Sequence, residues 1–131
     1  MTLTLAAVLL SLAIIPGFAQ VRVLRVAEDG IRGSASKVVM PVYPGRSRNR
    51  KVHGVAVVTL EYDGNGDVVD VKVEESPDKD TGRSVIDAAQ QWKFRPSKLD
   101  GQPAHVRGPL TFYFRIDKSG KARVENPSAF K

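Results

Sequence analysis

The stretch 84–96, SVIDAAQQWKFRP, constrains the fold most, because it predicts one amphipathic helix with a definite end. Its apolar side chains recur at i, i+3, i+4 and i+7, the spacing of one helical face: Val85, Ala88, Ala89 and Trp92. Ser84 and Asp87 have the spacing of a capping box, and Pro96 prevents the helix from continuing. We expect Trp92 to anchor this helix in a core rather than to stack on a ligand.

A β-hairpin is predicted over residues 54–75. The stretch 54–62, GVAVVTLEY, is rich in β-forming side chains. Residues 68–75 alternate between valine and charged side chains, which is typical of a half-buried strand. The connection at 63–67, DGNGD, consists of residues that tolerate positive φ. The apolar faces are formed by Ala56, Val58, Leu60 and Tyr62 and by Val69, Val71 and Val73.

The same stretch has the spacing of a calcium-binding loop. The side chains at positions one, three, five and twelve of such a loop are Asp63, Asn65, Asp67 and Glu74. Val68, however, stands where the loop needs glycine, and strands rather than helices flank it. We therefore expect no metal site here. His53 has no second histidine or acidic cluster near it in sequence, so a metal role is not expected there either.

The last predicted element is a strand at 104–117, in which apolar and polar side chains alternate. Pro109 lacks the N–H that a central strand needs, so we expect this strand at an edge of the sheet. An apolar edge strand either is covered or serves to pair with another chain. His105, near its start, is expected to be a surface residue, and residues 118–131 are expected to form a loose polar tail.

These elements together predict an α+β fold in two layers. A chain of 131 residues is long enough for one modest domain. The hairpin and the last strand form a three-stranded antiparallel sheet, and one main helix covers its apolar face. With a short helix before the hairpin, the order is helix–strand–strand–helix–strand.

The first twenty residues have the character of an export signal. The apolar run at 3–15 has the length of a signal-peptide core and is short for a membrane span. Gly17 and Ala19 are small residues that predict cleavage before Gln20. No Lys or Arg precedes the run, so an uncleaved N-terminal membrane anchor is the alternative. Both interpretations place the rest of the chain outside the cytoplasm.

The net charge of +6 is concentrated close to this leader. Residues 21–53 contain eight Lys and Arg against two acids, whereas residues 54–131 contain twelve of each sign. This distribution is not the domain-wide basic stripe that nucleic acids bind, and no nucleic-acid partner is expected. Residues 20–40 are interpreted as a basic linker, in which 21–26 either add a short strand or belong to a mobile tether.

Four positive residues in seven occupy the stretch 45–51, GRSRNRK. They are Arg46, Arg48, Arg50 and Lys51. One interpretation is contact with an anionic membrane or envelope surface, such as lipid headgroups, lipopolysaccharide or phosphate. The other is a solvated turn or one short helical turn.

Little in the sequence suggests catalysis. There is no cysteine, which excludes disulfides, thiolate metal sites and cysteine nucleophiles. Paired histidines, a phosphate-binding glycine loop and a nucleophile beside a base are also missing from the sequence. We therefore expect neither an enzyme nor a bound cofactor.

The ordered set of short motifs over residues 41–117 resembles the C-terminal domain of TonB, the periplasmic energy transducer of Gram-negative bacteria. The matching pieces are PVYP with SR at 41–48, GVAV at 54–57, GDV at 66–68, IDAA at 86–89, WKFRP at 92–96, GQP at 101–103, Pro109 and Phe112. No single piece is specific. Their order is specific, above all the helix-end WKFRP followed by GQP and a strand that contains proline.

The resemblance implies a helix–strand–strand–helix–strand fold and a binding function. In that family the last strand docks a short N-terminal peptide of an outer-membrane transporter, which is added to the sheet as an extra strand. Carried onto this chain, the docking strand consists of Pro109, Leu110, Thr111, Phe112, Tyr113, Phe114, Arg115 and Ile116. The implied location is the periplasm, and the implied process is energy-dependent transport across the outer membrane.

Some parts of the family pattern are not found. A full transducer has an anchoring helix with a histidine and a long proline-rich spacer, whereas residues 1–20 contain no histidine and residues 21–40 no proline. The alternative function is a stand-alone envelope scaffold, in which the last strand pairs with a second copy, as a homodimer, or with residues 21–26 of its own chain. The predicted division is a leader at 1–19, a linker at 20–40, a TonB-like domain at 41–117 and a tail at 118–131.

Overall fold

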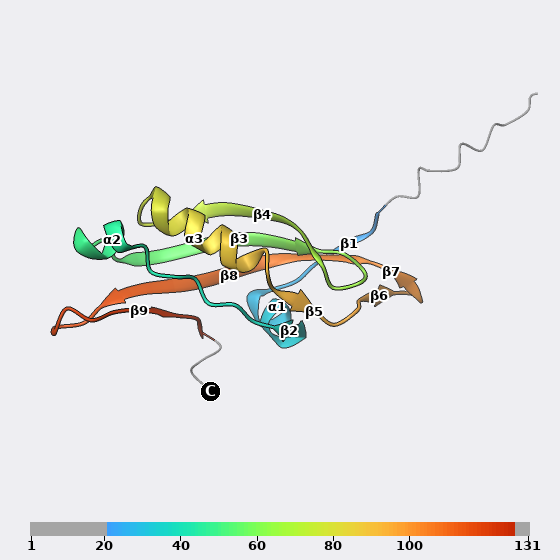
Figure 1. The fold of residues 1–131 in the computed structure, drawn as a ribbon. Coiled ribbons are helices and arrows are strands. Elements are labelled where there is room, and N and C mark those ends of the chain that lie inside the picture. Colours follow the sequence, from blue (N-terminus) through green and yellow to red (C-terminus); the bar gives the residue numbers. More distant parts are fainter. Residues whose placement is uncertain (1–20, 128–131) are drawn as a thin grey trace, which may run out of the picture.

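The computed structural model describes residues 21–127, so the predicted leader at 1–19 lies outside the described residues. The elements in chain order are β1 (Val23–Arg25), α1 (Glu28–Ser34), β2 (Ala35–Lys37), α2 (Gly45–Asn49), β3 (Gly54–Tyr62), β4 (Val68–Glu75), α3 (Lys79–Ala89), β5 (Lys93–Phe94), β6 (Lys98–Leu99), β7 (Gln102–Pro103), β8 (His105–Ile116) and β9 (Ala122–Glu125). Figure 1 shows an elongated sheet with α3 packed along one face.

The main sheet has the strand order β1–β8–β3–β4, and β9 also pairs with β8. The hairpin β3–β4 has the predicted bounds, and β3 pairs antiparallel with β8 from Gly54 opposite Phe114 to Tyr62 opposite Val106. The α+β class and the helix-on-sheet layering are thus confirmed. The sheet has five strands rather than the expected three, because short strands from both ends of the described chain join it.

The main helix begins earlier and ends earlier than predicted. Asp78 caps α3: its Oδ1 accepts from the Thr81 N–H at 2.8 Å, and the Thr81 Oγ1 accepts from the Asp78 N–H at 3.1 Å. The predicted capping box at Ser84 and Asp87 is wrong, because this reciprocal pair already closes the first turn six residues upstream. Ser84 instead donates to the carbonyl of Val42.

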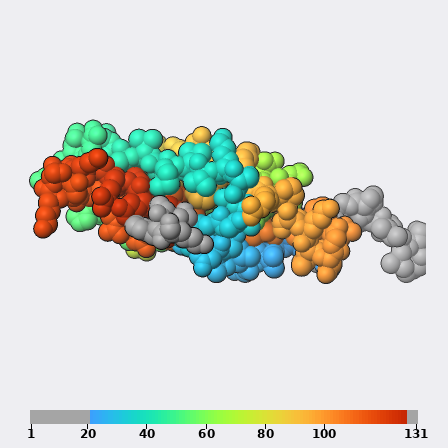
Figure 2. Space-filling view, turned by 90° about the horizontal axis from the view of Figure 1, so that it is seen from below, coloured from blue at the N-terminus to red at the C-terminus, as the bar shows by residue number. Residues whose placement is uncertain are grey.

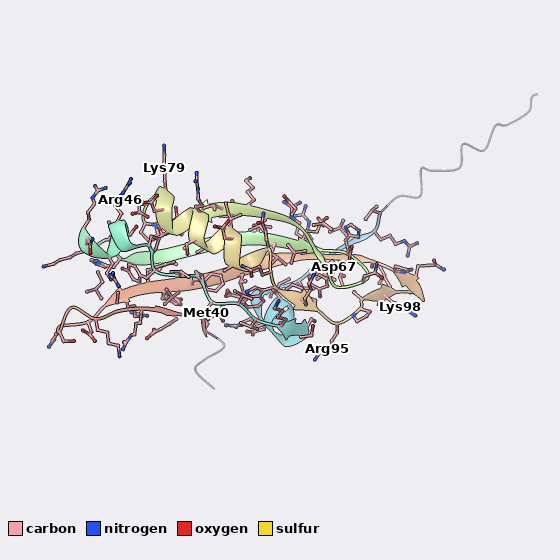
Figure 3. All side chains as sticks on the ribbon, viewed as in Figure 1. Met40, Arg46, Asp67, Lys79, Arg95 and Lys98 are labelled. Atoms are coloured by element: carbon pink, nitrogen blue, oxygen red, sulfur yellow. The ribbon has the colours of Figure 1, made fainter. Side chains whose placement is uncertain are left out.

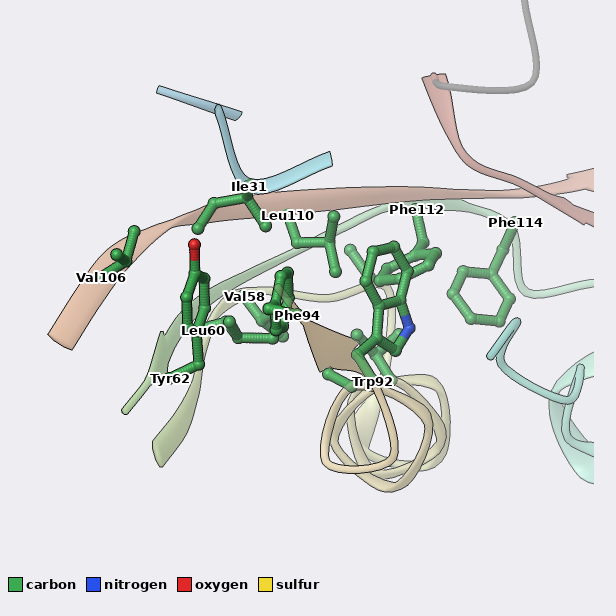
Figure 4. Close-up of a cluster of buried hydrophobic side chains, with 13 residues drawn as sticks. Ile31, Val58, Leu60, Tyr62, Trp92, Phe94, Val106, Leu110, Phe112 and Phe114 are labelled. Carbon is green, nitrogen blue, oxygen red and sulfur yellow. The ribbon is translucent and has the colours of Figure 1, made fainter. Parts of the chain in front are cut away.

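The core lies between α3 and the sheet (Figure 4). Trp92 follows the helix and is fully buried, and its ring meets that of Phe112 edge-on at 6.2 Å. Its Nε1 donates to the carbonyl of Val39 at 2.8 Å, so the one polar atom of the indole is satisfied. Beside it, the rings of Tyr62 and Phe94 stack at 4.0 Å. The predicted role of Trp92 as a core anchor is confirmed.

The segments expected to be linker and tail form regular elements. In the segment 21–36, β1 joins the sheet and α1 places Ile31 in the core, fully buried. A Cβ added at Gly108 would lie 2.7 Å from the Ile31 side chain, so this contact needs glycine. The expected loose tail is wrong at 122–125, because a turn capped by Asp117 returns the chain as β9.

Candidate protein-docking edge

The predicted docking strand, β8, is a central strand and not the open edge that Pro109 suggested. One of its edges pairs with β3; the other, here called the outer edge, faces away from β3. Strand β1 covers the outer edge up to Arg107 and β9 covers it from Tyr113 onward. Pro109 lies in the gap between them, which explains how a strand with neighbours on both sides accommodates a residue without an N–H.

The first part of the outer edge is closed by β1. Val23, Leu24 and Arg25 pair in parallel with residues 105–107. The ladder extends at both ends, because the His105 N–H donates to the Arg22 carbonyl at 2.8 Å and the Val26 N–H donates to the Arg107 carbonyl at 2.9 Å. Of the two interpretations of 21–26, the short strand is therefore correct, and it pairs with β8 as the scaffold hypothesis allowed.

The middle of the outer edge is closed by side chains. The N–H of Thr111 donates to the carboxylate of Glu28, and its carbonyl accepts from the Nδ2 of Asn126 at 3.2 Å. Glu28 belongs to α1, which follows β1, and Asn126 follows β9. Each of the two segments that cover the outer edge therefore also supplies one hydrogen bond to the gap between β1 and β9.

The last part of the outer edge is closed by β9. Its four residues pair antiparallel with Tyr113, Phe114, Arg115 and Ile116. Glu125 joins the two strands, because its carboxylate accepts from the Nε of Arg115 at 2.7 Å and from the Nε of Arg123 at 2.8 Å. The Arg115 guanidinium also lies over the Tyr113 ring, 5.0 Å from its centre. Of β9, only Val124 packs against the core.

The predicted docking residues divide between the two faces of β8. Leu110, Phe112 and Phe114 face α3 and are buried, so their side chains belong to the core. The opposite face carries Thr111 and Tyr113, which are half-buried, and Arg115, which is exposed. Pro109 and Ile116 are half-buried as well. A partner strand would therefore meet the backbone of β8 and, on the open face, mainly Tyr113 and Arg115.

The predicted anionic-surface residues form one group, here called the basic cluster: Arg46, Arg48, Arg50 and Lys51. All four are exposed on α2 and the turn after it (Figure 3 labels Arg46). The buried Ser47 fixes α2 to the start of α3 by donating to the Asp78 Oδ2 at 2.7 Å. Burial alone would raise the pKa of Asp78, but hydrogen bonds from Thr81 and Ser47 and the charge of Arg50 hold that pKa below its ordinary value.

One of two polar sites, His105, differs from the sequence-based expectation. His105 is half-buried, and its Nδ1 lies 3.0 Å from the Glu61 carboxylate, so it has a partner in the neighbouring strand that spacing alone could not reveal. In the hairpin turn, the Asp63 Oδ1 accepts from the N–H groups of Asn65 and Asp67, each at 3.0 Å. Across residues 21–127, no group of three or more potential metal ligands is found.

Residues 39–116 match the protein family described as Gram-negative bacterial TonB protein C-terminal. The chain belongs to the TonB C-terminal family. TonB is a non-enzymatic protein-interaction family, and the chain is accordingly not an enzyme. Strands β1 and β9, which cover the outer edge of β8, both lie outside the matched residues.

Curated TonB proteins and a solved TonB domain are similar to this chain. Protein TonB of Xanthomonas campestris pv. campestris is 37% identical over 82 residues, which are 60% of this chain and 37% of that protein. Protein TonB of Vibrio cholerae is 29% identical over 83 residues, or 63% of this chain and 34% of that protein. The chain thus spans about a third of the length of these relatives.

The solution NMR structure of the Pseudomonas aeruginosa TonB C-terminal domain superposes with a TM-score of 0.54 at 28% identity, covering 64% of this chain and 86% of that one. Its likeness supports the TonB-type arrangement of helix and sheet. Within the part of the chain that the structure describes, no helix is long and apolar enough to cross a membrane.

Proposed function

We propose that this chain is a periplasmic TonB-like binding domain that docks the N-terminal peptide of an outer-membrane transporter as an added strand on β8, in energy-dependent transport across the outer membrane. The observation that carries the proposal is the unequal closure of the outer edge of β8. The β1–α1 part is anchored in the core through Ile31, whereas β9 is four residues long and contributes one partly buried valine.

Exchange is therefore proposed at Tyr113–Ile116, with β9 as the strand that leaves. An incoming strand would make the same kind of backbone hydrogen bonds that β9 makes, so these bonds contribute little to the net binding free energy. The gain in binding free energy comes from side chains that fit β8 better than those of β9. The sequence predicted a docking segment at Pro109–Ile116, and the proposal now limits that segment to its last four residues.

The chemistry of the departing strand indicates what a partner should carry. When β9 leaves, Arg115 loses the Glu125 carboxylate at 2.7 Å and its charge is no longer paired. An acidic side chain on the incoming strand, placed opposite Tyr113 as Glu125 is, would restore that pairing. We therefore propose that the partner peptide has a carboxylate near one end of an apolar, β-forming stretch.

The test is an NMR titration of the ¹⁵N-labelled chain with synthetic N-terminal peptides of outer-membrane transporters. We expect amide shifts at 113–116, loss of the β9 signals at 122–125 from their folded positions, and unchanged signals at 23–25. A peptide with its carboxylate changed to an amide should bind more weakly. Shifts confined to other strands, or no shifts with any peptide, would reject the docking site.

A stand-alone scaffold that associates with itself is the second candidate. The observation that favours it is β4, which ends the sheet on the side away from β8. Within residues 21–127, β3 is the only strand that pairs with its eight residues. Its open edge is a template for a second copy. The alternation of Asp70, Lys72 and Glu74 weakens that template, because charged side chains protect edge strands from pairing. Sedimentation equilibrium separates the two functions, since a monomer at high concentration rejects the scaffold.

A further inference from the structure

An extended segment at 38–44 presents a row of apolar side chains to solvent. Every second residue points outward, and these three form what is here called the apolar ridge: Val38, Met40 and Val42, which are 52%, 40% and 77% exposed. The residues between them point inward, with Pro41 buried and Val39 and Tyr43 packed against the core. Exposed apolar side chains are ordinary when scattered, but a fixed row of them indicates a contact surface.

The ridge is held rigidly. The carbonyl of Val39 accepts from the Trp92 indole, the carbonyl of Val42 accepts from the Ser84 hydroxyl, and the Tyr43 ring packs edge-on against Phe114 at 5.2 Å. Three contacts in seven residues fix the backbone against α3 and the sheet. The outward side chains therefore cannot turn into the core, and they are displayed at constant spacing.

Positive charge surrounds the ridge in sequence and in space. From residue 30 to residue 60 the chain has six Lys and Arg and no Asp or Glu. Figure 2 shows the turquoise part of this segment, which contains the ridge and α2, exposed along one side of the molecule. Lys37 precedes the ridge and the basic cluster follows it on α2. No side chain of the basic cluster is among the ion pairs found in residues 21–127.

The acids that face this region come from α3. Asp80 and Asp87 line the groove between the ridge and the helix, together with Arg83. Asp78 is already engaged by Ser47 and Thr81. Arg83, Lys37 and the four residues of the basic cluster together give six positive charges against these three acids, so the region keeps a positive excess.

We propose that the apolar ridge and the basic cluster together bind the surface of an anionic lipid bilayer. Apolar side chains enter the headgroup boundary while Lys and Arg pair with lipid phosphates, which is how peripheral segments adhere to membranes. The basic cluster alone would suit any polyanion. The adjoining ridge selects a lipid surface, because free phosphate offers nothing for three exposed apolar side chains to enter. This surface is separate from the outer edge of β8 and does not rest on peptide docking.

The absence of cysteine allows a direct test on the full chain. Single variants Val42→Cys, on the ridge, and Val69→Cys, on β4, receive an environment-sensitive fluorophore. Val69 is the matched control, because it is an exposed valine at 49% with the acids Asp67 and Asp70 nearby in sequence. With vesicles of phosphatidylglycerol and phosphatidylethanolamine, the blue shift of the fluorophore's emission should be several-fold larger at position 42 than at position 69. Both variants carry the same residues 1–20, so the comparison does not depend on how that segment binds the vesicles. Equal shifts at both positions would overturn the proposal.

Three further measurements identify what causes the fluorescence shift at position 42. Replacing Arg46, Arg48 and Lys51 by glutamine spares Arg50, which acts on Asp78, and should reduce the shift at position 42 to the level of the control. Removing the same charge at Lys98, Lys118 and Lys121 should leave that shift within about two-fold of its original size, since these lysines belong neither to the apolar ridge nor to the basic cluster. The proposal of a specific anionic-membrane surface is overturned if both triple variants lose the shift equally. It is also overturned if inorganic phosphate or phosphatidylcholine vesicles produce the same shift.

Discussion

Replacing Ile31 by alanine tests whether the β1–α1 cover of β8 is a permanent part of the fold. Ile31 is fully buried and packs against Gly108, where even one added carbon would collide with its side chain. Truncating a fully buried isoleucine costs about 2–5 kcal/mol, and a tightly packed site lies in the middle of that range, near ~3 kcal/mol. Such a loss is a large part of the ~5–15 kcal/mol that stabilises a domain.

Urea unfolding followed by tryptophan fluorescence measures the effect, because Trp92 is the only tryptophan and lies in the same core cluster. With a slope of about 1.5 kcal/mol per molar urea, the midpoint should fall by about 2 M. Leu24→Ala is the matched control: Leu24 belongs to β1 but is 41% exposed, and we expect a loss below about 1 kcal/mol. If Ile31→Ala costs no more than Leu24→Ala, α1 is a removable cover and the assignment of exchange to β9 fails.

Two further stability predictions follow from the caps and turns. Asp78→Ala should cost about 1–2 kcal/mol at pH 7, because it removes the α3 cap. The folded pKa of Asp78 lies below its ordinary, unfolded value, so this contribution is fully present above the ordinary pKa and is lost as the pH falls through the folded pKa. Thermal melts at pH 7 and pH 2 should show the difference from wild type shrinking in acid, and a constant difference would contradict the cap. Gly66→Ala should destabilise by at least about 3 kcal/mol, because its Cβ would lie 1.8 Å from the Phe94 carbonyl oxygen at φ +86°, whereas Gly120→Ala at φ +84°, with nothing within 4 Å, isolates the backbone cost of about 1 kcal/mol; equal effects in chemical unfolding would show that the close approach is not rigid.

Local patterns predicted the elements that have local causes. The hairpin was found with its bounds because valine alternation and DGNGD act within 22 residues. The sequence predicts the start of α3 too late, because Asp78 and Thr81 form an Asp–x–x–Thr cap, whereas Ser84 and Asp87 offer a similar spacing six residues further along the same helix. Its apolar face was nevertheless correct, since Val85, Ala88 and Ala89 are buried whichever cap begins the helix.

The surroundings of β8 could not be predicted, because they depend on pairing between distant residues. Val23 pairs with His105, which is far away in sequence. Nothing in the short strand Val23–Arg25 indicates which strand it pairs with or that the pairing is parallel. Strand β9 did leave a signal in the turn that precedes it. The Asp117 carboxylate accepts hydrogen bonds from Ser119 and Lys121, which lower its pKa, and Gly120 adopts φ +84°. DKSG at 117–120 is therefore the turn of the β8–β9 hairpin and not the start of a loose tail.

The central claim is that a partner strand replaces β9 on β8, and truncation tests it most directly. A chain ending at Lys121 lacks β9, whereas a control chain ending at Pro127 keeps it and loses only residues outside the described range. Isothermal titration with a transporter peptide should show tighter binding to the chain that lacks β9, because the binding-competent edge no longer has to be vacated. Equal or weaker binding by that chain, with circular dichroism showing that it is folded, would contradict the exchange of β9 for the partner.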